Sequence, residues 1–455
     1  IKKHLGKYST AKGKYDVYIP FTELSLAISK PQGSVIFINP TRFMHRDYGK
    51  DLRQFIRENI TLKSVIDFGN VQNFENAITY TGIFHYKCNP PASNYDIEIS
   101  TSLIDRPLKF ESDVLNSDVW YFNDPDTLVI LDKIKSNTKT LRENLEGIFQ
   151  GIATGKDSVF VVSNEMVNQY KLEKNYLVKW LKGKDIAPYK INWSGNYCIY
   201  PYDEYGKVVD EKFLATDAPN IYHYLKDKKD ELAGRGYFEK SSKQWYELWN
   251  QRNKKRFARP KLVTLDTASR NSFTYDDSDF FGTTTTYSLI PNQKEILKPL
   301  LAILNSRLMN FYHKKNTIPQ AGGYFRYQAS FIENLPIKNN LTKELRDLLS
   351  FIVDYVLITQ KFTVGSQIEI SELEEVIDAL VFELYFPEEF QSKGINIEKH
   401  AKELFKPIDN LSEEQKVEQI KAVYEELRKK ENPLRNQIKL MKIELKDLLL
   451  PILSV

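Results

Sequence analysis

The front of the chain alternates between segments with helical and with strand-like spacing of apolar residues. Val17–Ser29 and Gly49–Glu58 place apolar residues three or four positions apart, and this spacing predicts two helices. Ser34–Pro40 is a short apolar run typical of a buried parallel strand, and two further strands are predicted at Leu62–Phe68 and Thr79–Tyr86. Helices and strands in this order predict part of a doubly wound α/β sheet.

The rest of the chain changes in character twice. We expect the partial sheet to occupy residues 1–110 and a linker with one helix to occupy residues 111–146. Residues 147–337 contain short mixed elements rich in Tyr, Trp, Asn and Gly, which predict a mixed α+β domain. In residues 338–455 apolar residues recur at helical spacing and predict an α-helical tail. The expected fold class is therefore α/β, followed by α+β and then all-α.

A doubly wound sheet normally opens with a glycine-rich turn that binds a ligand. Residues 1–110 contain no such turn, and the chain begins with Ile1 rather than Met. We therefore expect the first strands of the sheet to lie upstream, in a missing N-terminal part of the same polypeptide.

The composition excludes several classes of protein. Two cysteines, Cys88 and Cys198, are too few for a disulfide scaffold or a zinc cluster and fit a reducing, cytoplasmic environment. The six histidines show no metal-ligand spacing, so no metal site is expected. We find no apolar run long enough to span a bilayer and no serine or cysteine nucleophile signature. The carboxylate and lysine pattern of many restriction nucleases is also absent, so any nuclease of the parent enzyme is expected before Ile1.

The formal net charge of +4 is unevenly distributed. Lys and Arg outnumber Asp and Glu in residues 151–336, whereas acidic residues are in excess in the rest of the chain. A basic domain between acidic ends indicates a polyanionic partner, and double-stranded DNA is the one we expect.

The densest mixture of basic and aromatic residues lies at positions 243–256, and a glycine-containing loop at 322–327 carries an arginine. Basic side chains position DNA through its phosphates, and Arg, Asn and Gln can also contact base edges. The alternative is an ordinary solvated charge run. The candidate DNA-binding residues are Lys156, Arg235, Lys243, Trp245, Tyr246, Arg252, Lys254, Lys255, Arg256, Arg270, Tyr324 and Arg326.

Gly151–Lys156 has some features of a phosphate-binding loop. It has one residue too few between its glycines, and Asp157 stands where a Ser or Thr would meet magnesium. We therefore expect Lys156 to contact a DNA phosphate and do not expect a nucleotide pocket.

Several strings, in a fixed order, resemble the γ-class, TaqI-like adenine-specific DNA methyltransferases, including those within type IIG restriction–modification enzymes. Those of the methyltransferase part are Tyr15–Phe21, Lys30–Ile38 and Ile66–Thr81. Those of the target-recognition domain are Gly151–Lys156, Leu181–Ile186, Leu304–Arg307 and Glu333–Ile337. Each string alone is weak evidence, and their common order is what makes the resemblance specific.

The resemblance implies a function and two site residues. The chain would be the DNA-recognition portion of a site-specific adenine methyltransferase that helps to hold an adenine flipped out of the duplex. Phe74 would stack on that adenine, and Phe21 would pack on the adenine ring of the cofactor S-adenosylmethionine. For each phenylalanine the alternative is an ordinary place in the core.

The resemblance also shows what this sequence lacks. The family orients its target adenine through an Asn-Pro-Pro-Tyr motif, which should lie just before Lys7 and is not present. Asn89–Ala92 has alanine in place of the aromatic residue, and Asn39–Thr41 has one proline and no aromatic residue, so both are interpreted as turns. We therefore expect no catalytic residue in this chain, no tightly bound S-adenosylmethionine and no methylation by the chain alone.

Two other functions remain open at this stage. One is a stand-alone DNA-binding specificity subunit without methyltransferase activity in the same chain, although the partial sheet of residues 1–110 argues against it. The other is an assembly subunit that uses the apolar faces of the helical tail. Whether the parent enzyme also cuts DNA is not encoded in any motif that we find.

Overall fold

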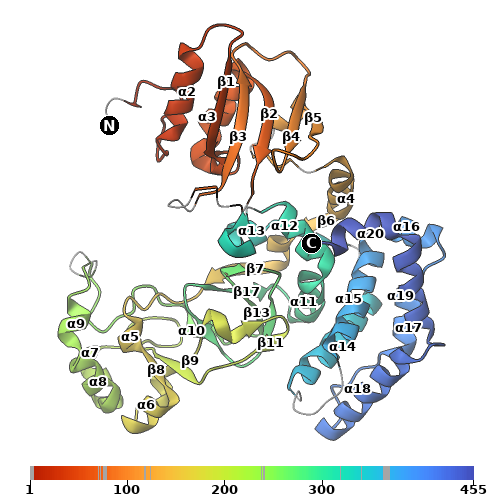
Figure 1. Cartoon of the computed structure of the whole chain (residues 1–455). Helices are drawn as coiled ribbons and strands as arrows, with labels where there is room; N and C mark the ends of the chain where they lie inside the picture. The colour runs from red at the N-terminus through yellow and green to blue at the C-terminus, as the bar shows by residue number, and fades with distance from the viewer. Residues whose placement is uncertain are drawn as a thin grey trace. The chain divides into compact units, whose positions relative to one another are not determined.

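The computed structural model describes residues 5–69, 71, 73–74, 79–116, 119–122, 124–236, 238, 241–317, 319–339, 341–361 and 369–455 (Figure 1). The chain divides into two compact units. Unit 1 comprises residues 1–130 and 314–325, and unit 2 comprises residues 131–313 and 326–455.

A five-stranded sheet forms the centre of unit 1, with strand order β1-β3-β2-β4-β5. The strands are β1 (Ser34–Pro40), β2 (Thr61–Asp67), β3 (Thr81–Lys87), β4 (Asp96–Ser100) and β5 (Leu108–Glu111). Strand β3 runs antiparallel to both of its neighbours, β1 and β2, so these two point in the same direction. Strand β4 pairs parallel with β2 and antiparallel with β5.

Two helices, α2 (Tyr18–Ile28) and α3 (Lys50–Asn59), pack on one face of this sheet (Figure 1). Their apolar residues meet those of the strands in one core, because residues at helical spacing point to the same side of a helix. The fully buried members of this core include Ile19, Leu52, Ile56, Leu62, Val65, Phe84 and Tyr86. The alternation of helix and strand predicted for the front of the chain is therefore observed.

The expectation that Ser34–Pro40 is a buried parallel strand is wrong. Within the described residues β1 pairs only with β3, and it does so antiparallel, at the edge of the sheet. Ile36 and Ile38 point away from the helices and are 63% and 46% exposed. A short apolar run shows that a strand is rich in apolar residues, but it does not fix the direction of its neighbour or what covers its second face.

A four-stranded antiparallel sheet, β15-β13-β17-β7, lies at the centre of unit 2. Its strands are β7 (Leu145–Gln150), β13 (Lys261–Leu265), β15 (Thr274–Asp276) and β17 (Thr286–Pro291). Strand β17 runs antiparallel to both β7 and β13. The ends of β7 and β13 and the beginning of β17 therefore meet at one edge of the sheet.

A second sheet of unit 2 has the order β16-β9-β12-β8, and its strands are β8 (Val161–Ser163), β9 (Leu177–Leu181), β12 (Asn196–Ile199) and β16 (Phe281–Gly282). Short helices surround it: α5 (Asp157–Phe160), α6 (Asn164–Gln169), α7 (Glu211–Asp217), α8 (Pro219–Lys226), α9 (Lys229–Ala233) and α10 (Lys254–Phe257). Strand β6 (Thr138–Thr140) follows helix α4 (Pro125–Lys135) and pairs with β20 (Pro336–Lys338). This pairing ties the start of the mixed region to its end.

A fully buried ion pair joins two strands of the central sheet. Lys261 and Asp276 face each other on β13 and β15, and Nζ of Lys261 lies 2.5 Å from Oδ2 of Asp276. The same ammonium donates to the carbonyl of Phe257 in α10, at 2.6 Å. The Asp276 carboxylate also accepts from the backbone N–H groups of Ser278 and Phe280. Burial raises the pKa of Asp276, and the neighbouring lysine opposes this rise.

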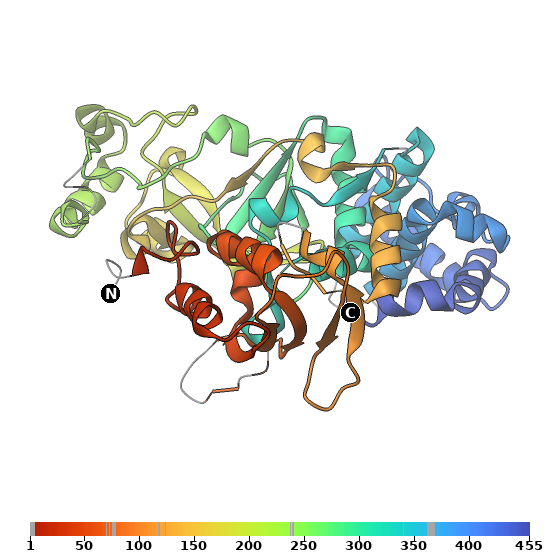
Figure 2. The ribbon, with the colours of Figure 1, turned by 90° about the horizontal axis from the view of Figure 1, so that it is seen from above.

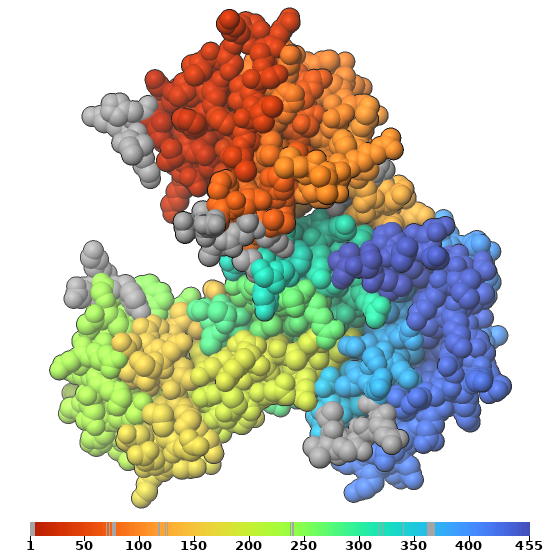
Figure 3. Space-filling model, in the orientation of Figure 1, coloured from red at the N-terminus to blue at the C-terminus, as the bar shows by residue number. Residues whose placement is uncertain are grey.

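Helices fill the last part of unit 2, as the apolar spacing predicts. They are α14 (Lys343–Lys361), α15 (Ile370–Tyr385), α16 (Pro387–Ser392), α17 (Ile397–Leu404), α18 (Glu413–Arg428), α19 (Pro433–Glu444) and α20 (Lys446–Leu453). They gather at one end of unit 2, drawn in blue (Figure 2). Helix α14 packs on α11 (Leu297–Asn305), so this helical region lies directly against the mixed region (Figure 3). Among the described residues, no helix is long and apolar enough to cross a membrane.

Polar contacts also join the helical region to the rest of unit 2. Oδ1 of Asp378 on α15 accepts from the backbone N–H of Arg307, at 2.7 Å, and Oδ2 lies 3.4 Å from Nε of the same arginine. Tyr385 donates to the carbonyl of Pro336, at 2.7 Å. Burial, more than any other influence, raises the pKa of Asp378 to about 7.

This carboxyl gives the stability of the protein a specific pH dependence. An aspartate in an unfolded chain has a pKa of about 3.9, so between about pH 4 and 7 the folded state holds a proton that the unfolded state has released. The free energy of unfolding must then fall as the pH rises through this window. We expect Asp378→Asn to make the fall shallower in urea denaturation measured from pH 4.5 to 8. A fall as steep as in the wild type would contradict the assignment.

Candidate nucleic-acid interface

The two phenylalanines expected to stack on adenine rings lie in unit 1 and are both exposed. Phe21 on α2 is 57% exposed and stacks on Phe37 of β1, with ring centroids 6.0 Å apart. Phe74 lies at a bend and is 43% exposed, whereas Glu75–Ala77 of the same motif lie outside the described residues. A core phenylalanine would be buried, so the alternative of a core role gains no support. The stacking roles stay predictions.

Of the two strings interpreted as turns, Asn89–Ala92 lies in a loop, whereas Asn39 and Pro40 belong to β1, so the interpretation of Asn39–Thr41 as a turn is wrong. The Asn39 side chain is buried and donates to Oγ1 of Thr22, at 3.0 Å. The Asn89 side chain donates to Oγ1 of Thr61 and to the carbonyl of Pro90. In this structure both amides are used within the fold.

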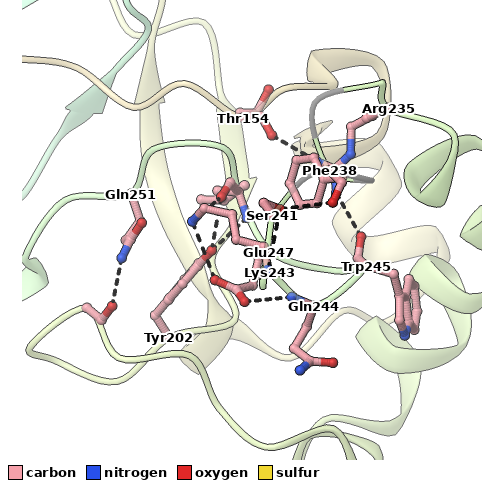
Figure 4. Close-up of polar contacts among 12 residues, drawn as sticks. Thr154, Tyr202, Arg235, Phe238, Ser241, Lys243, Gln244, Trp245, Glu247 and Gln251 are labelled. Carbon is pink, nitrogen blue, oxygen red and sulfur yellow. Dashed lines mark hydrogen bonds and ion pairs between the residues drawn. The ribbon is translucent and has the colours of Figure 1, made fainter.

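Arg235 holds together three segments of unit 2 (Figure 4). Its guanidinium donates to the carbonyls of Leu232, Thr154 and Trp245, at 2.7, 3.2 and 2.7 Å. The guanidinium carbon also lies 3.5 Å from the ring centroid of Phe238. The residue is only 6% exposed. The structure therefore gives Arg235 a positioning role instead of the DNA contact that we expected, because a buried guanidinium cannot reach a phosphate.

The neighbouring residues Lys243, Trp245 and Tyr246 belong to the same internal network. Tyr246 is buried and donates to the carbonyl of Val209, at 2.8 Å. Trp245 is half-buried and donates through Nε1 to Glu211, and Nζ of Lys243 lies 3.5 Å from Glu247. The expected DNA contact of Tyr246 is thus not available in this structure. Aromatic residues among charges look alike in a sequence whether they build a core or a binding surface.

Gly151 and Lys156 lie on a loop after β7. This loop runs beside residues 282–286, which we call the strand-end turn because they lead into β17 of the central sheet. A Cβ atom at Gly151 would come within 2.2 Å of the carbonyl oxygens of Gly282 and Thr283, so the close approach of two backbones requires glycine there. The N–H of Gly151 donates to the carbonyl of Thr286 and is not available to a phosphate. Lys156 is half-exposed and pairs with Glu231, at 2.8 Å. Contact of Lys156 with DNA stays a prediction.

The basic run Arg252–Arg256 does not form one surface. Arg256 pairs with Glu146 at the beginning of β7, at 3.0 Å, and Lys254 donates to the carbonyl of Asn175. Lys255 is exposed above the ring of Tyr205. Arg252 instead reaches the other end of β7, where Nε donates to the carbonyl of Gln150, at 2.5 Å. The run is thus divided between the two ends of one strand.

The edge where β7 and β13 end and β17 begins gathers polar side chains from distant parts of the chain. We call it the Arg326 edge and define it by Gln150, Arg252, Asp266, Thr284 and Arg326. The Gln150 side chain donates to the carbonyl of Thr284, at 2.7 Å, and Nη1 of Arg326 donates to Oδ2 of Asp266, at 2.8 Å. The N–H of Asp266 donates to the carbonyl of Thr285, next to Thr284.

Both arginines of the Arg326 edge, Arg252 and Arg326, lie close enough to Tyr287 to affect the pKa of its phenol. Burial raises the pKa of the Tyr287 phenol, and the carboxylate of Asp266 raises it further. The positive charges of Arg326 and Arg252 act in the opposite direction on the same phenol. Two cations, an anion and several carbonyl and amide groups thus share this edge, which suits contacts with phosphates and base edges.

The remaining candidates are Arg270 and Tyr324. Arg270 is exposed and lies close enough to Glu374 on α15 to lower the pKa that burial raises there. Tyr324 is exposed in the loop that contains Gly322 and Gly323, both with positive φ, and this loop belongs to unit 1. Within the described residues no group of His, Cys, Asp and Glu side chains is arranged to hold a metal ion.

Sequence reasoning missed Asp266, Gln150 and Thr284. The signal for the threonine is Thr283–Thr286, a run of four threonines that leads into β17. Nothing local marks Asp266, because its partner Arg326 lies 60 positions further along the chain.

Comparison with known proteins supplies relatives for both units. Residues 178–337 match the TaqI-like C-terminal specificity domain, and residues 1–74 match the Eco57I restriction-modification methylase. The chain is 25% identical over 418 residues to the type II methyltransferase M.BstVI of Geobacillus stearothermophilus, covering 84% of this chain and 72% of that protein. It is 24% identical over 357 residues to the type II methyltransferase M.PaeR7I of Pseudomonas aeruginosa, covering 74% and 61%.

A solved structure with a similar fold is the type IIL restriction–modification enzyme MmeI, described in complex with DNA. The TM-score is 0.55 at 12% identity, over 93% of this chain and 54% of that one. The chain therefore spans about half the length of MmeI and between 61% and 72% of the two curated relatives. The resemblance inferred from the motifs is confirmed: the chain carries a TaqI-like specificity domain and is similar to type II methyltransferases.

The network around Arg235 leads to a prediction about stability. Hydrogen bonds to charged groups contribute about 1.5–3 kcal/mol each, and loss of the guanidinium leaves buried carbonyls without a donor. We expect Arg235→Ala to lower the free energy of unfolding by at least about 3 kcal/mol, measured by urea denaturation. The exposed Lys255→Ala is the matched control and should change it by less than about 0.5 kcal/mol. Equal stability of the two variants would contradict the positioning role.

Proposed function

We propose that this chain, with its TaqI-like specificity domain, is the DNA-recognition portion of a site-specific adenine DNA methyltransferase of the kind found in type IIG restriction–modification enzymes. The observation that carries the proposal is the presence of both matches in one chain, a methylase match in residues 1–74 and a specificity match in residues 178–337. The two match in the order in which the motifs of the methyltransferase and of its target-recognition domain occur along the sequence.

The proposed partner of unit 2 is double-stranded DNA. The specificity domain carries the basic excess of the chain, and its Arg326 edge combines Arg252 and Arg326 with the amide of Gln150 and the threonines of the strand-end turn. Such groups bind phosphates and read base edges. The similar MmeI structure is described in complex with DNA, which supports the same partner here.

The proposed cofactor of the parent enzyme is S-adenosylmethionine, which supplies the methyl group that is transferred. Of the residues in this chain, Phe21 fits one part of that molecule, because its exposed ring can stack on an adenine. No glycine-rich turn and no Asn-Pro-Pro-Tyr motif occur in the sequence to hold the methionine part or the target adenine. We therefore place the chemical step on residues outside this chain and propose that the chain alone does not methylate DNA.

The proposed second partner is a further part of the same polypeptide that covers the open side of unit 1. Strand β1 leaves one edge unpaired within the described residues, and Ile36 and Ile38 expose apolar surface beside it. An unpaired edge with apolar side chains favours the addition of another strand. Further strands of a methyltransferase sheet would pair with the free edge of β1, and the element that carries them would cover Ile36 and Ile38.

A stand-alone specificity subunit is the second candidate function. One observation favours it, because the helical region and the specificity domain, except residues 314–325, belong to one compact unit, and the methylase-like sheet belongs to the other. Methyl transfer by a longer polypeptide that includes an Asn-Pro-Pro-Tyr motif upstream decides between the two. Transfer to adenine supports the methyltransferase, and its absence in a folded, cofactor-binding polypeptide supports the subunit.

DNA binding by the chain itself is the first test. We expect duplex binding whose logarithmic affinity falls with the logarithm of salt, with a slope of about −0.9 for each phosphate that is contacted. Joint replacement of Lys254, Lys255 and Arg256 by Ala should reduce this slope by between about 1 and 3 if the three contact phosphates. Fluorescence anisotropy at several salt concentrations measures both quantities.

The matched control replaces three exposed lysines of the acidic helical region, Lys421, Lys430 and Lys446, by Ala. It removes the same charge from a surface that we do not assign to DNA, so the slope should stay unchanged. If both triple variants reduce the slope equally, the basic run is an ordinary solvated surface and contributes only through net charge.

The role of Phe74 is testable in the longer, active polypeptide. Stacking of one base on an aromatic ring is typically worth about 1–3 kcal/mol, so Phe74→Ala should slow methylation by roughly ten- to a hundredfold. Phe74→Tyr should keep most of the activity, because its ring offers the same face. Since Phe74 is 43% exposed, neither variant should lower the melting temperature appreciably. A large loss of melting temperature with normal turnover of the folded fraction would instead assign Phe74 to the core.

A further inference from the structure

Arg326 is held on both sides by contacts within unit 2. Its backbone carbonyl is bonded by Nε2 of the buried His313, at 2.9 Å, and the N–H of the next residue, Tyr327, donates to the carbonyl of Asp266, at 2.8 Å. The ring of Tyr327 stacks on that of His313, with centroids 4.3 Å apart. The point from which the arginine side chain departs is therefore fixed relative to the end of β13.

The side chain is fixed as well. Nη1 of Arg326 donates to Oδ2 of Asp266, at 2.8 Å, and lies 3.5 Å from Oγ1 of Thr267. The hydroxyl of Thr267 in turn donates to the same carboxylate oxygen, at 3.2 Å. Asp266 is itself anchored through its N–H to the carbonyl of Thr285. A carboxylate placed in this way orients the planar guanidinium and reduces the rotamer entropy that the arginine loses on binding.

Only part of the guanidinium is used by these contacts. Within the described residues Nη1 alone has hydrogen-bond partners, and the side chain is one-third exposed. The remaining N–H groups of a guanidinium form a fork that matches two neighbouring acceptors. The second carboxylate oxygen of Asp266, Oδ1, is buried and has no hydrogen-bond partner within the described residues. Such an atom costs about 1–3 kcal/mol in a fold and often marks a functional position.

The charge of the pair decides between two kinds of DNA contact. A phosphate is attracted by net positive charge at any orientation, and Asp266 neutralises much of the charge of Arg326. A guanine presents its O6 and N7 atoms as two acceptors in the major groove, and a rigid fork recognises them through direction more than through charge. A neutralised, immobilised arginine therefore suits a guanine better than a phosphate.

We propose that Arg326 recognises one guanine of the target site and that Asp266 is the positioning residue that orients it. The proposal rests on the proposed function, because it requires that unit 2 binds duplex DNA. Beyond that function, it assigns to Arg326 and Asp266 the preference for a G·C pair at one position of the target site.

To test this, the full 455-residue chain is used to select duplexes that it binds from a random DNA library, and the bound duplexes are sequenced. We expect the wild type to enrich a motif that contains a G·C pair. Arg326→Lys and Asp266→Asn should both lose the preference at the same single position, by roughly 10- to 100-fold, and keep the preferences at the others. Lys421→Ala, an exposed lysine of the helical region that we do not assign to DNA, is the control and should keep all of them.

A second measurement needs no substitution in the protein. In the selected duplex, 7-deazaguanine at the assigned position removes the N7 acceptor. The wild type should then bind roughly 10-fold more weakly, and Asp266→Asn should bind both duplexes alike. Melting curves of the variants show whether each is folded.

Four outcomes overturn the proposal. Arg326→Lys that weakens binding equally on all sequences identifies a phosphate contact. If Arg326→Lys and Asp266→Asn keep the full G·C preference, and the wild type binds the 7-deazaguanine duplex as tightly as the guanine duplex, the pair has only a structural role. If the wild type enriches no sequence and shows no salt-dependent DNA binding, the proposed function itself is overturned. If it binds DNA without a G·C preference, only the role of Arg326 is overturned.

Discussion

The position of strand β13 depends on the buried ion pair of Lys261 and Asp276, and much of unit 2 depends on β13. Both side chains are fully buried, so neither charge is tolerable without the other, and removal of one partner of such a pair typically costs about 3–5 kcal/mol. The pair joins two directly opposed positions of β13 and β15 and reaches α10 through Phe257. It therefore fixes the register of a strand whose other end carries Asp266. A shift of one residue would turn Asp266 to the opposite face of the sheet.

The same dependence continues into the helical region. Asn305, within the Leu304–Arg307 string that resembles a family landmark, exchanges hydrogen bonds with the backbone N–H and carbonyl of Phe273. Asn271 donates to the carbonyl of Leu304 and accepts from Tyr327, the residue that follows Arg326. Asp378 then holds the backbone of Arg307 from α15. The helical region thus supports the segment that carries the Arg326 edge.

Periodicity predicted the helices and strands well, because burial on one side leaves a regular trace in the sequence. It failed for Ser34–Pro40, since a run of apolar residues does not encode whether the second face of a strand is covered. The string around Trp245 and Tyr246 was expected to face DNA and instead fills an internal network. The pair of Asp266 and Arg326 was found only through three-dimensional contact, because 60 positions separate its members.

The two units differ in how completely they bury their apolar surface, and this difference bears on function. Unit 2 closes its sheets with helices, and its buried Lys261 and Asp276 form an ion pair. Unit 1 leaves Ile36 and Ile38 beside an unpaired strand edge and exposes Phe21 on the neighbouring helix. Exposed apolar surface of this kind is stabilised when another element covers it. We therefore expect DNA binding, which we propose for unit 2, to depend less on an additional covering element than a methyltransferase activity that involves unit 1.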